Sequence, residues 1–117
     1  MNQKQLHKVK ITVLKTNFFE DISKEYGVDG LSSCPINKEG DVFCVDLTKP
    51  ERFCNGAWEV LYPYVLKLAS DGENASFFNG NWINKPGIAI VSCGDGLRPV
   101  IFKLEATDIP FNLKYPK

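Results

Sequence analysis

The sequence predicts an α+β fold: a single domain with a mixed or antiparallel sheet of about four strands and two helices packed on it. Short segments alternate apolar and polar residues, and two longer stretches show helical spacing. Their order is β-α-β-α-β-β, with the last two strands joined by a glycine-rich turn. The chain has 117 residues, a length typical of one domain with a true core. We expect one domain over residues 1–117, with residues 1–7 as a flexible arm.

The first strand is predicted over residues 8–15 and the first helix over residues 18–26. Val9, Ile11 and Val13 alternate with polar residues, as in a half-buried strand. Asn17 and Glu20 resemble a capping box before the helix. The residues that share one face of this helix are Phe18, Phe19, Ile22 and Tyr26. Gly27 stands where the helix is expected to end.

The second strand is predicted over residues 41–47, where apolar residues alternate again before Pro50. This pattern places Cys44 on the face opposite Phe43, where a buried small apolar side chain is favoured. The second helix is predicted between Asn55 and Ala69, with a stripe formed by Trp58, Leu61, Val65 and Leu68. Pro63 divides this stretch, so we expect a short first turn and a main helix that begins near Tyr62.

A hairpin is predicted at the end of the chain, after a long aromatic loop over residues 73–87 that is either a lid or a structured excursion. The two strands are expected over 88–92 and 100–106, joined by a turn around Asp95-Gly96. A glycine with positive φ makes such turns at no steric cost. Asp95 offers a second way to form the turn, through hydrogen bonds of its own side chain.

Charge and hydropathy exclude several functional classes. Lys and Arg number 14 and so do Asp and Glu, so we expect neither a nucleic-acid partner nor an anionic membrane partner. The sequence has no signal peptide and no apolar stretch that could span a bilayer, which predicts a cytoplasmic protein. Four cysteines in such a compartment are expected to be thiols or metal ligands rather than disulfides.

Three of the four cysteines lie at predicted element ends. Cys34 precedes a proline in a loop, Cys54 directly precedes the second helix, and Cys93 ends a strand. Free backbone N–H groups at a helix start and in a glycine-rich turn favour a thiolate. One hypothesis is that Cys34, Cys54 and Cys93 bind zinc or an iron–sulfur cluster in an accessory or carrier protein. No C-x-x-C pair is present, so these ligands would have to converge through the fold.

A second hypothesis is a small thiol-dependent enzyme in which Cys93 or Cys54 is the reactive sulfur. Arg98 and Asp95 would then hold a small anionic ligand, with Asp95 also a candidate proton carrier. Arg98 has a structural alternative, which is pairing with Asp95 or Glu105. Trp58 is a candidate aromatic wall beside the ligand.

Two further interpretations concern the remaining features of the chain. The only histidine, His7, lies in the N-terminal arm, which argues against a cysteine–histidine pair. A third hypothesis is a structural subunit with inert cysteines, whose aromatic residues pack a homo-oligomer.

The cysteine motifs also carry a resemblance. The matching segments are Cys34-Pro35, Gly40 with Phe43, Phe53-Cys54 with Ala57-Trp58, Leu61-Tyr62-Pro63, and Cys93 with Asp95-Gly96-Leu97-Arg98-Pro99-Val100 and Phe102. Together they resemble a family of small bacterial and archaeal proteins of unknown function with scattered cysteines. The likeness runs from about residue 8 to residue 105. It implies that Cys34, Cys54 and Cys93 act as one unit, without Cys44, and it implies no activity.

Overall fold

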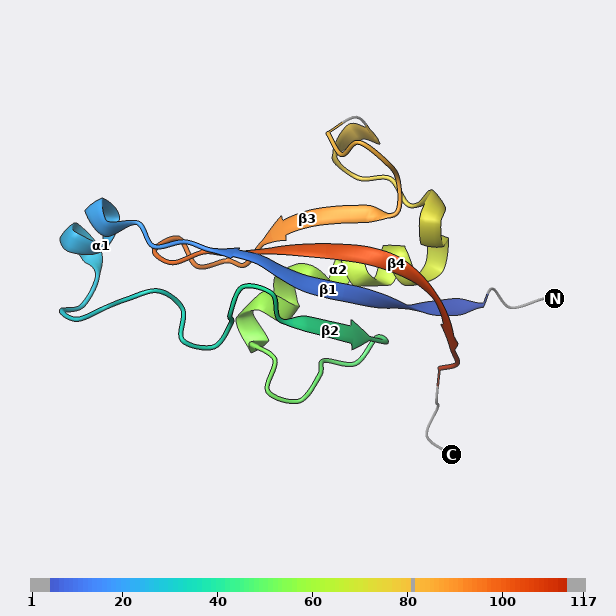
Figure 1. The fold of residues 1–117 in the computed structure, drawn as a ribbon, viewed down its shortest axis with the longest axis horizontal. Coiled ribbons are helices and arrows are strands. Elements are labelled where there is room, and N and C mark those ends of the chain that lie inside the picture. Colours follow the sequence, from blue (N-terminus) through green and yellow to red (C-terminus); the bar gives the residue numbers. More distant parts are fainter. Residues whose placement is uncertain (1–4, 81, 114–117) are drawn as a thin grey trace.

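The computed structural model describes residues 5–80 and 82–113. Figure 1 shows its main elements, which are β1 (Leu6–Thr16), α1 (Glu20–Tyr26), β2 (Val42–Val45), α2 (Asn55–Asp71), β3 (Ile88–Ser92) and β4 (Val100–Phe111). The strands form one antiparallel sheet in the order β2-β1-β4-β3. The predicted α+β class is therefore confirmed. Of the expected flexible arm, Leu6 and His7 belong to β1, whereas residues 1–4 lie outside the described part of the chain.

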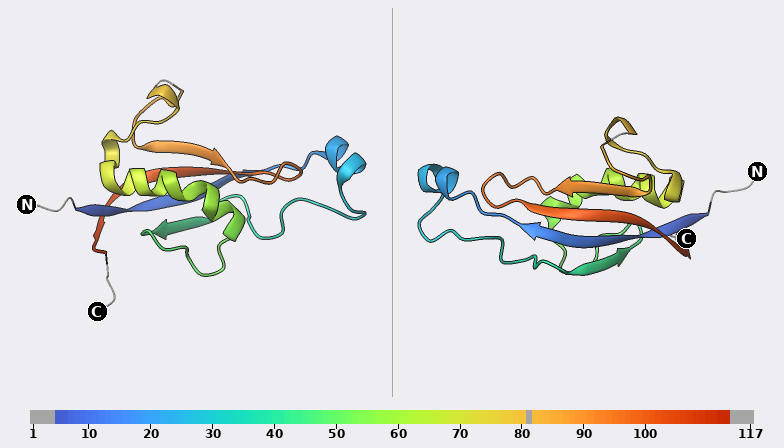
Figure 2. Two further views of the ribbon diagram at one scale, coloured as in Figure 1. Left: turned by 180° about the vertical axis from the view of Figure 1, so that it is seen from behind. Right: turned by 45° about the horizontal axis from the view of Figure 1, so that its top comes forward.

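The core lies between α2 and one face of the sheet. The alternation predicted for β1 is realised, because Val9, Ile11 and Val13 are all buried. Leu61 and Val65 of α2 are fully buried against this face. Figures 1 and 2 show that α2 crosses only this face and that no described helix covers the other face. The molecule is thus two layers thick, with an extent of 21 Å along its shortest axis.

The helix α2 is continuous, and the predicted break near Tyr62 is wrong. Pro63 lies inside the helix, where its missing N–H removes the bond to the carbonyl of Glu59. Leu61 and Val65, on either side of it, are both buried, so packing holds the helix through this position. The helix ends at Gly72, which has a φ of 61° and whose N–H bonds the carbonyl of Leu68.

The short helix α1 lies beyond the ends of the strands rather than on a face of the sheet (Figures 1 and 2). Its N-cap residue is Phe19, which makes no side-chain cap bond, so the predicted capping box of Asn17 and Glu20 is wrong. Backbone bonds fix the entry to the helix instead. The N–H of Phe19 donates to Leu97 O at 2.8 Å, and that of Asn17 donates to Pro99 O at 2.9 Å.

The aromatic loop after α2 is a structured excursion in its described part. Two 3₁₀ turns, η1 (Gly72–Asn74) and η2 (Phe78–Gly80), shape it. Its base is closed by the N–H of Gly87, which donates to Ala75 O at 2.7 Å. The Phe77 ring lies 5.5 Å from that of Tyr64, which docks the loop on α2. This packing holds the described part of the loop against α2.

Candidate functional site

Three of the four cysteines come to the same end of the sheet. The antiparallel order places the end of β3 beside the start of β4 and the end of β1, and Cys93 follows β3 directly. Figure 1 shows the start of α2 at this same end, where Cys54 is the N-cap residue. The loop before β2, which carries Cys34, returns here as well. All three side chains are partly buried against the common core.

These cysteines do not form a metal-ligand set as arranged here. Among residues 5–80 and 82–113, no group of three or more Cys, His, Asp or Glu side chains could hold a metal ion. Zinc and iron–sulfur centres in proteins need several donors on one metal or one cluster. The structure therefore offers zinc or an iron–sulfur cluster no ready-made donor set from Cys34, Cys54 and Cys93.

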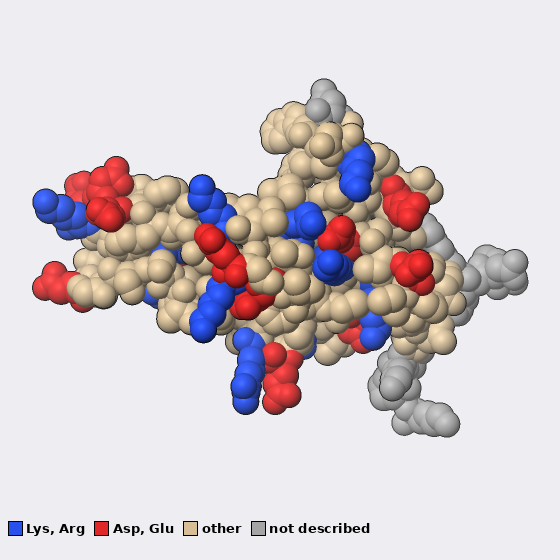
Figure 3. All heavy atoms as spheres, viewed as in Figure 1, with Lys and Arg blue, Asp and Glu red and all other residues tan. Residues whose placement is uncertain are grey.

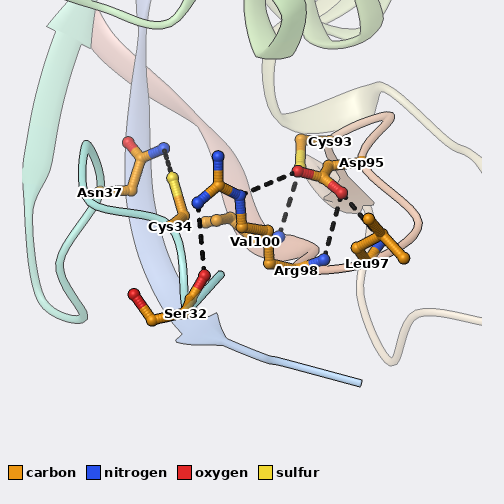
Figure 4. Close-up of polar contacts among 8 residues, drawn as sticks. All are labelled: Ser32, Cys34, Asn37, Cys93, Asp95, Leu97, Arg98 and Val100. Carbon is orange, nitrogen blue, oxygen red and sulfur yellow. Dashed lines mark hydrogen bonds and ion pairs between the residues drawn. The ribbon is translucent and has the colours of Figure 1, made fainter. Parts of the chain in front are cut away.

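Cys93 is bonded to Val100 across the base of the loop that joins β3 to β4. The N–H of Cys93 donates to Val100 O at 3.0 Å, and the N–H of Val100 donates to Cys93 Sγ at 3.3 Å. Figure 4 shows the sulfur aimed at this amide. The thiol is thus held in one orientation by a backbone donor in a partly buried position.

The turn after Cys93 is built by the side chain of Asp95. Its Oδ1 accepts the N–H of Leu97 at 2.8 Å and that of Arg98 at 3.1 Å, and its Oδ2 lies 3.4 Å from Arg98 Nε. Gly94 and Gly96 do not have positive φ values, so the expected glycine-based turn is wrong and the expected side-chain turn is confirmed. Burial raises the pKa of Asp95, but the bonds from Leu97 and Arg98 outweigh it and hold that pKa below 3.8, its usual value.

Arg98 joins this loop to the segment that carries Cys34. Its Nη1 donates to Ser32 O at 3.3 Å, across 66 positions of sequence. The predicted pairing with Asp95 is confirmed, whereas Glu105 lies next to Lys10 and Lys103 instead. The guanidinium remains partly exposed, and Nη2 has no bond to another described residue. One edge of the group is therefore open to an anion.

Cys34 has a polar partner that the sequence analysis missed. Asn37, only 6% exposed, directs its Nδ2 at Cys34 Sγ at 3.8 Å. In the view of Figure 4, the Arg98 guanidinium lies between the sulfurs of Cys34 and Cys93. The spacing of Asn37 three residues after Cys34, with Pro35 between them, is a turn pattern that could have pointed to this contact. The bond that the Ser32 carbonyl accepts from Arg98 could not be predicted from the sequence.

Cys54 and Trp58 have structural partners in the first turn of α2. The N–H of Trp58 donates to Cys54 O at 3.0 Å, while the Cys54 side chain caps no backbone amide. The Trp58 ring lies 5.8 Å from Phe53 and 6.0 Å from Tyr62. These rings make Trp58 part of an aromatic cluster that packs on the core.

The two remaining candidates, His7 and Cys44, lie apart from these cysteines. His7 is at the opposite end of the sheet, and Cys44 is on the face that α2 does not cover. His7 is opposite Pro110 near the start of β1, so the chain's only histidine is far from Cys93 along the strand. The expectation of a buried Cys44 is wrong, because this thiol is exposed. The alternation around Phe43 was correct, but the second face of the sheet carries no described helix that could bury it.

Comparisons with protein-family models, with curated proteins and with solved structures each found no match. Among the described residues, no helix combines the length and the apolar character needed to cross a bilayer.

Proposed function

We propose that this chain is a small thiol-dependent protein in which Cys93 is the reactive sulfur and Arg98 binds an anionic part of the substrate. The observation that carries the proposal is the 3.3 Å contact between Val100 N–H and Cys93 Sγ. A donor aimed at sulfur stabilises negative charge there, and the thiolate is the nucleophilic form of cysteine. The thiol is also partly exposed, so a small molecule can reach it.

Asp95 has a positioning role in this proposal. Its carboxylate already accepts bonds from two backbone amides and from the Arg98 side chain. These bonds leave it suited to fixing the turn and the guanidinium rather than to carrying a proton. Arg98, fixed by Asp95 and by Ser32 O, then directs its free edge toward a carboxylate or similar anion.

The chemical step is exchange between Cys93 and a small anionic disulfide. The Cys93 thiolate attacks one sulfur of the substrate, a new S–S bond forms, and the substrate's own S–S bond breaks. The second half of the substrate leaves as a thiolate and takes a proton from water. Cys93 is oxidised to a mixed disulfide, and the leaving sulfur is reduced, so electrons balance.

The metal-binding hypothesis has less support. It needs Cys34, Cys54 and Cys93 on one ion, and the described residues contain no such group. The thiol proposal requires only Cys93, Val100 and Arg98 as they stand. The hypothesis of inert cysteines is distinguished from the thiol proposal by the rate at which Cys93 reacts.

The test measures how fast Cys93 reacts with two disulfide probes. A variant that keeps Cys93 alone, with Cys34, Cys44 and Cys54 replaced by serine, is mixed with dithiobis-nitrobenzoate, which carries two carboxylates, or with uncharged dithiodipyridine. We expect Arg98→Gln to slow the anionic probe about tenfold, the factor for loss of one charge-assisted bond. The rate with the uncharged probe should change little.

The matched control is a variant that keeps only Cys44, the exposed thiol on β2. Arg98→Gln should leave both of its rates unchanged. Thermal unfolding of every variant checks that the fold is intact. If native Cys93 reacts more slowly than free cysteine with both probes, and becomes fast only in denaturant, the thiol is inert and the proposal fails. Metal analysis of the wild-type protein tests the weaker hypothesis.

A further inference from the structure

The helix α1 turns its apolar side outward. Phe19, Ile22 and Tyr26 follow helical spacing on one stripe, yet they are 42%, 41% and 75% exposed. The residue of this helix that is buried is the small polar Ser23. An isolated helix of seven residues is marginal in water, because most helices are stabilised by packing of their apolar face. The exposed stripe is therefore available for contact with another molecule.

The segment after α1 extends this surface. Val28 and Ile36 are 75% and 55% exposed, and Figures 1 and 2 show that the whole segment projects beyond the strands. We call residues 19–36 the tip. A concentration of large exposed apolar side chains on one projection is typical of an interaction surface.

The tip is acidic as well as apolar, which narrows the choice of partner. It carries four acids, Glu20, Asp21, Glu25 and Asp29, and the single lysine Lys24. Figure 3 shows these charged side chains at the end of the molecule. An anionic lipid surface would repel this tip, because such surfaces attract basic segments. The partner surface should combine apolar side chains with an excess of lysine.

The uncovered face of the sheet has this composition. We call it the open face; its strand residues are Lys8, Lys10, Thr12, Lys15, Val42, Cys44, Ile88, Ile90, Ser92, Ile101, Lys103 and Glu105. Figure 3 views the molecule from this side and shows charged side chains spread over the strands. Glu105 is the acid of this set, and it lies 3.9 Å from Lys10 and 3.3 Å from Lys103. The strand residues of the open face therefore carry four lysines against one acid, beside Ile88 and Ile90.

We propose that the tip of one copy of this chain lies on the open face of a second copy, and that the contact is reciprocal. The apolar stripe of α1 would pack on the isoleucines of β3 and β4, and the tip acids would face the lysines of β1. Because each copy supplies both surfaces, two such contacts related by a two-fold axis close a dimer. Such a dimer covers both the tip and the open face.

The first experiment measures the oligomeric state of the full chain by analytical ultracentrifugation at low and high salt. We expect a dimer whose dissociation constant rises with salt, since the Debye length falls from about 10 Å at 0.1 M to about 3 Å at 1 M. Glu20→Lys with Glu25→Lys should raise the constant about tenfold or more. The matched control is Leu66→Ser, which removes an exposed leucine of α2 and should have no effect. A wild-type monomer at every concentration and salt overturns the proposal.

Complementation tests that the two surfaces contact each other. The variant with Ile22→Ser and Tyr26→Ser loses the tip surface, and the variant with Lys10→Gln and Lys103→Gln loses the open face. Each alone should be monomeric. A mixture should recover a heterodimer, because one intact tip still meets one intact open face. If the mixture stays monomeric while each variant folds, the two surfaces do not pair and the proposal fails.

A cross-link provides an independent measure of the same contact. Val28→Cys is combined with native Cys44 while the other three cysteines are serine, and mild oxidation is followed by mass spectrometry. We expect a disulfide between position 28 of one chain and Cys44 of the other. Glu59→Cys, on the exposed side of α2, is the control that should not link. A link between two copies of position 28 would mean tip-to-tip packing and would overturn the proposal.

Discussion

Asp95 binds Arg98 twice, once through the backbone and once through the side chain. Its Oδ1 accepts the Arg98 N–H at 3.1 Å, and its Oδ2 lies 3.4 Å from Arg98 Nε. The same guanidinium reaches Ser32 O, so one carboxylate fixes both the turn after β3 and its attachment to the loop of Cys34. The orientation of the proposed anion-binding group therefore depends on Asp95.

Replacing Asp95 by alanine should lower the free energy of unfolding by about 1–2 kcal/mol. The loss comes from two backbone amides that the carboxylate bonds, because hydrogen bonds to charged groups are worth more than neutral ones. The ion pair itself adds little, since the Asp95 side chain is 40% exposed. Urea unfolding measures the change. The exposed Asp108, replaced by alanine, is the control and should shift stability by less than about 0.5 kcal/mol.

The stabilisation from the Asp95 charge should disappear at low pH. The pKa of Asp95 is lower in the folded chain than its ordinary value of 3.8, so the carboxylate stabilises the fold above that value. As the pH falls through the folded pKa, both states become protonated and the contribution is lost. Asp95→Asn keeps an Oδ1 acceptor without the charge. We expect the stability advantage of wild type over Asp95→Asn to be larger at pH 7 than in acid and to shrink as the pH falls below 3.8; an unchanged difference would contradict the assignment.

Two leucines of α2 should respond very differently to truncation. Leu61 is fully buried against the sheet, whereas Leu66 is 41% exposed. Leu61→Ala should cost about 2–5 kcal/mol, because it removes buried methyl groups and leaves a cavity. Leu66→Ala should cost less than about 1 kcal/mol. Equal losses, measured by urea unfolding, would mean that α2 does not pack as described.

Pro63→Ala should stabilise the protein. Alanine restores the amide that can bond Glu59 O inside the continuous helix, and proline is about 3 kcal/mol less favourable than alanine in a helix interior. Proline also restricts the unfolded chain, which offsets about 0.4–1 kcal/mol of this gain. We expect a net increase of about 2–2.6 kcal/mol in the free energy of unfolding. A decrease would indicate that the proline ring makes packing contacts that outweigh the lost bond.

Much of the fold followed from local patterns. The apolar alternation of β1 matches its buried residues, and the final hairpin lies at the predicted place. The break at Pro63 was wrong because a local rule was overridden by burial of Leu61 and Val65. The stripe of α1 was recognised, but its exposure was not foreseen.

The site was predictable only in part. Asp95 and Arg98 are three positions apart, so their pairing could be predicted from the local sequence. The bond from Arg98 to Ser32 spans 66 positions, and no spacing rule identifies it. Whether Cys34, Cys54 and Cys93 share one end of the sheet depends on strand order, which the sequence pattern leaves open.

By itself, the sequence determined where most strands and helices lie and that a turn follows β3, because periodicity and short-range hydrogen bonding act between near neighbours; it left open whether glycine or the Asp95 side chain forms that turn. Strand order, the layer that covers each face, and the gathering of three cysteines at one end of the sheet were decided only in the folded chain. An apolar stripe predicts that one face of a helix tends to be buried. What covers that face depends on packing between residues that are far apart in the sequence. For α1, we propose that this cover is a second molecule.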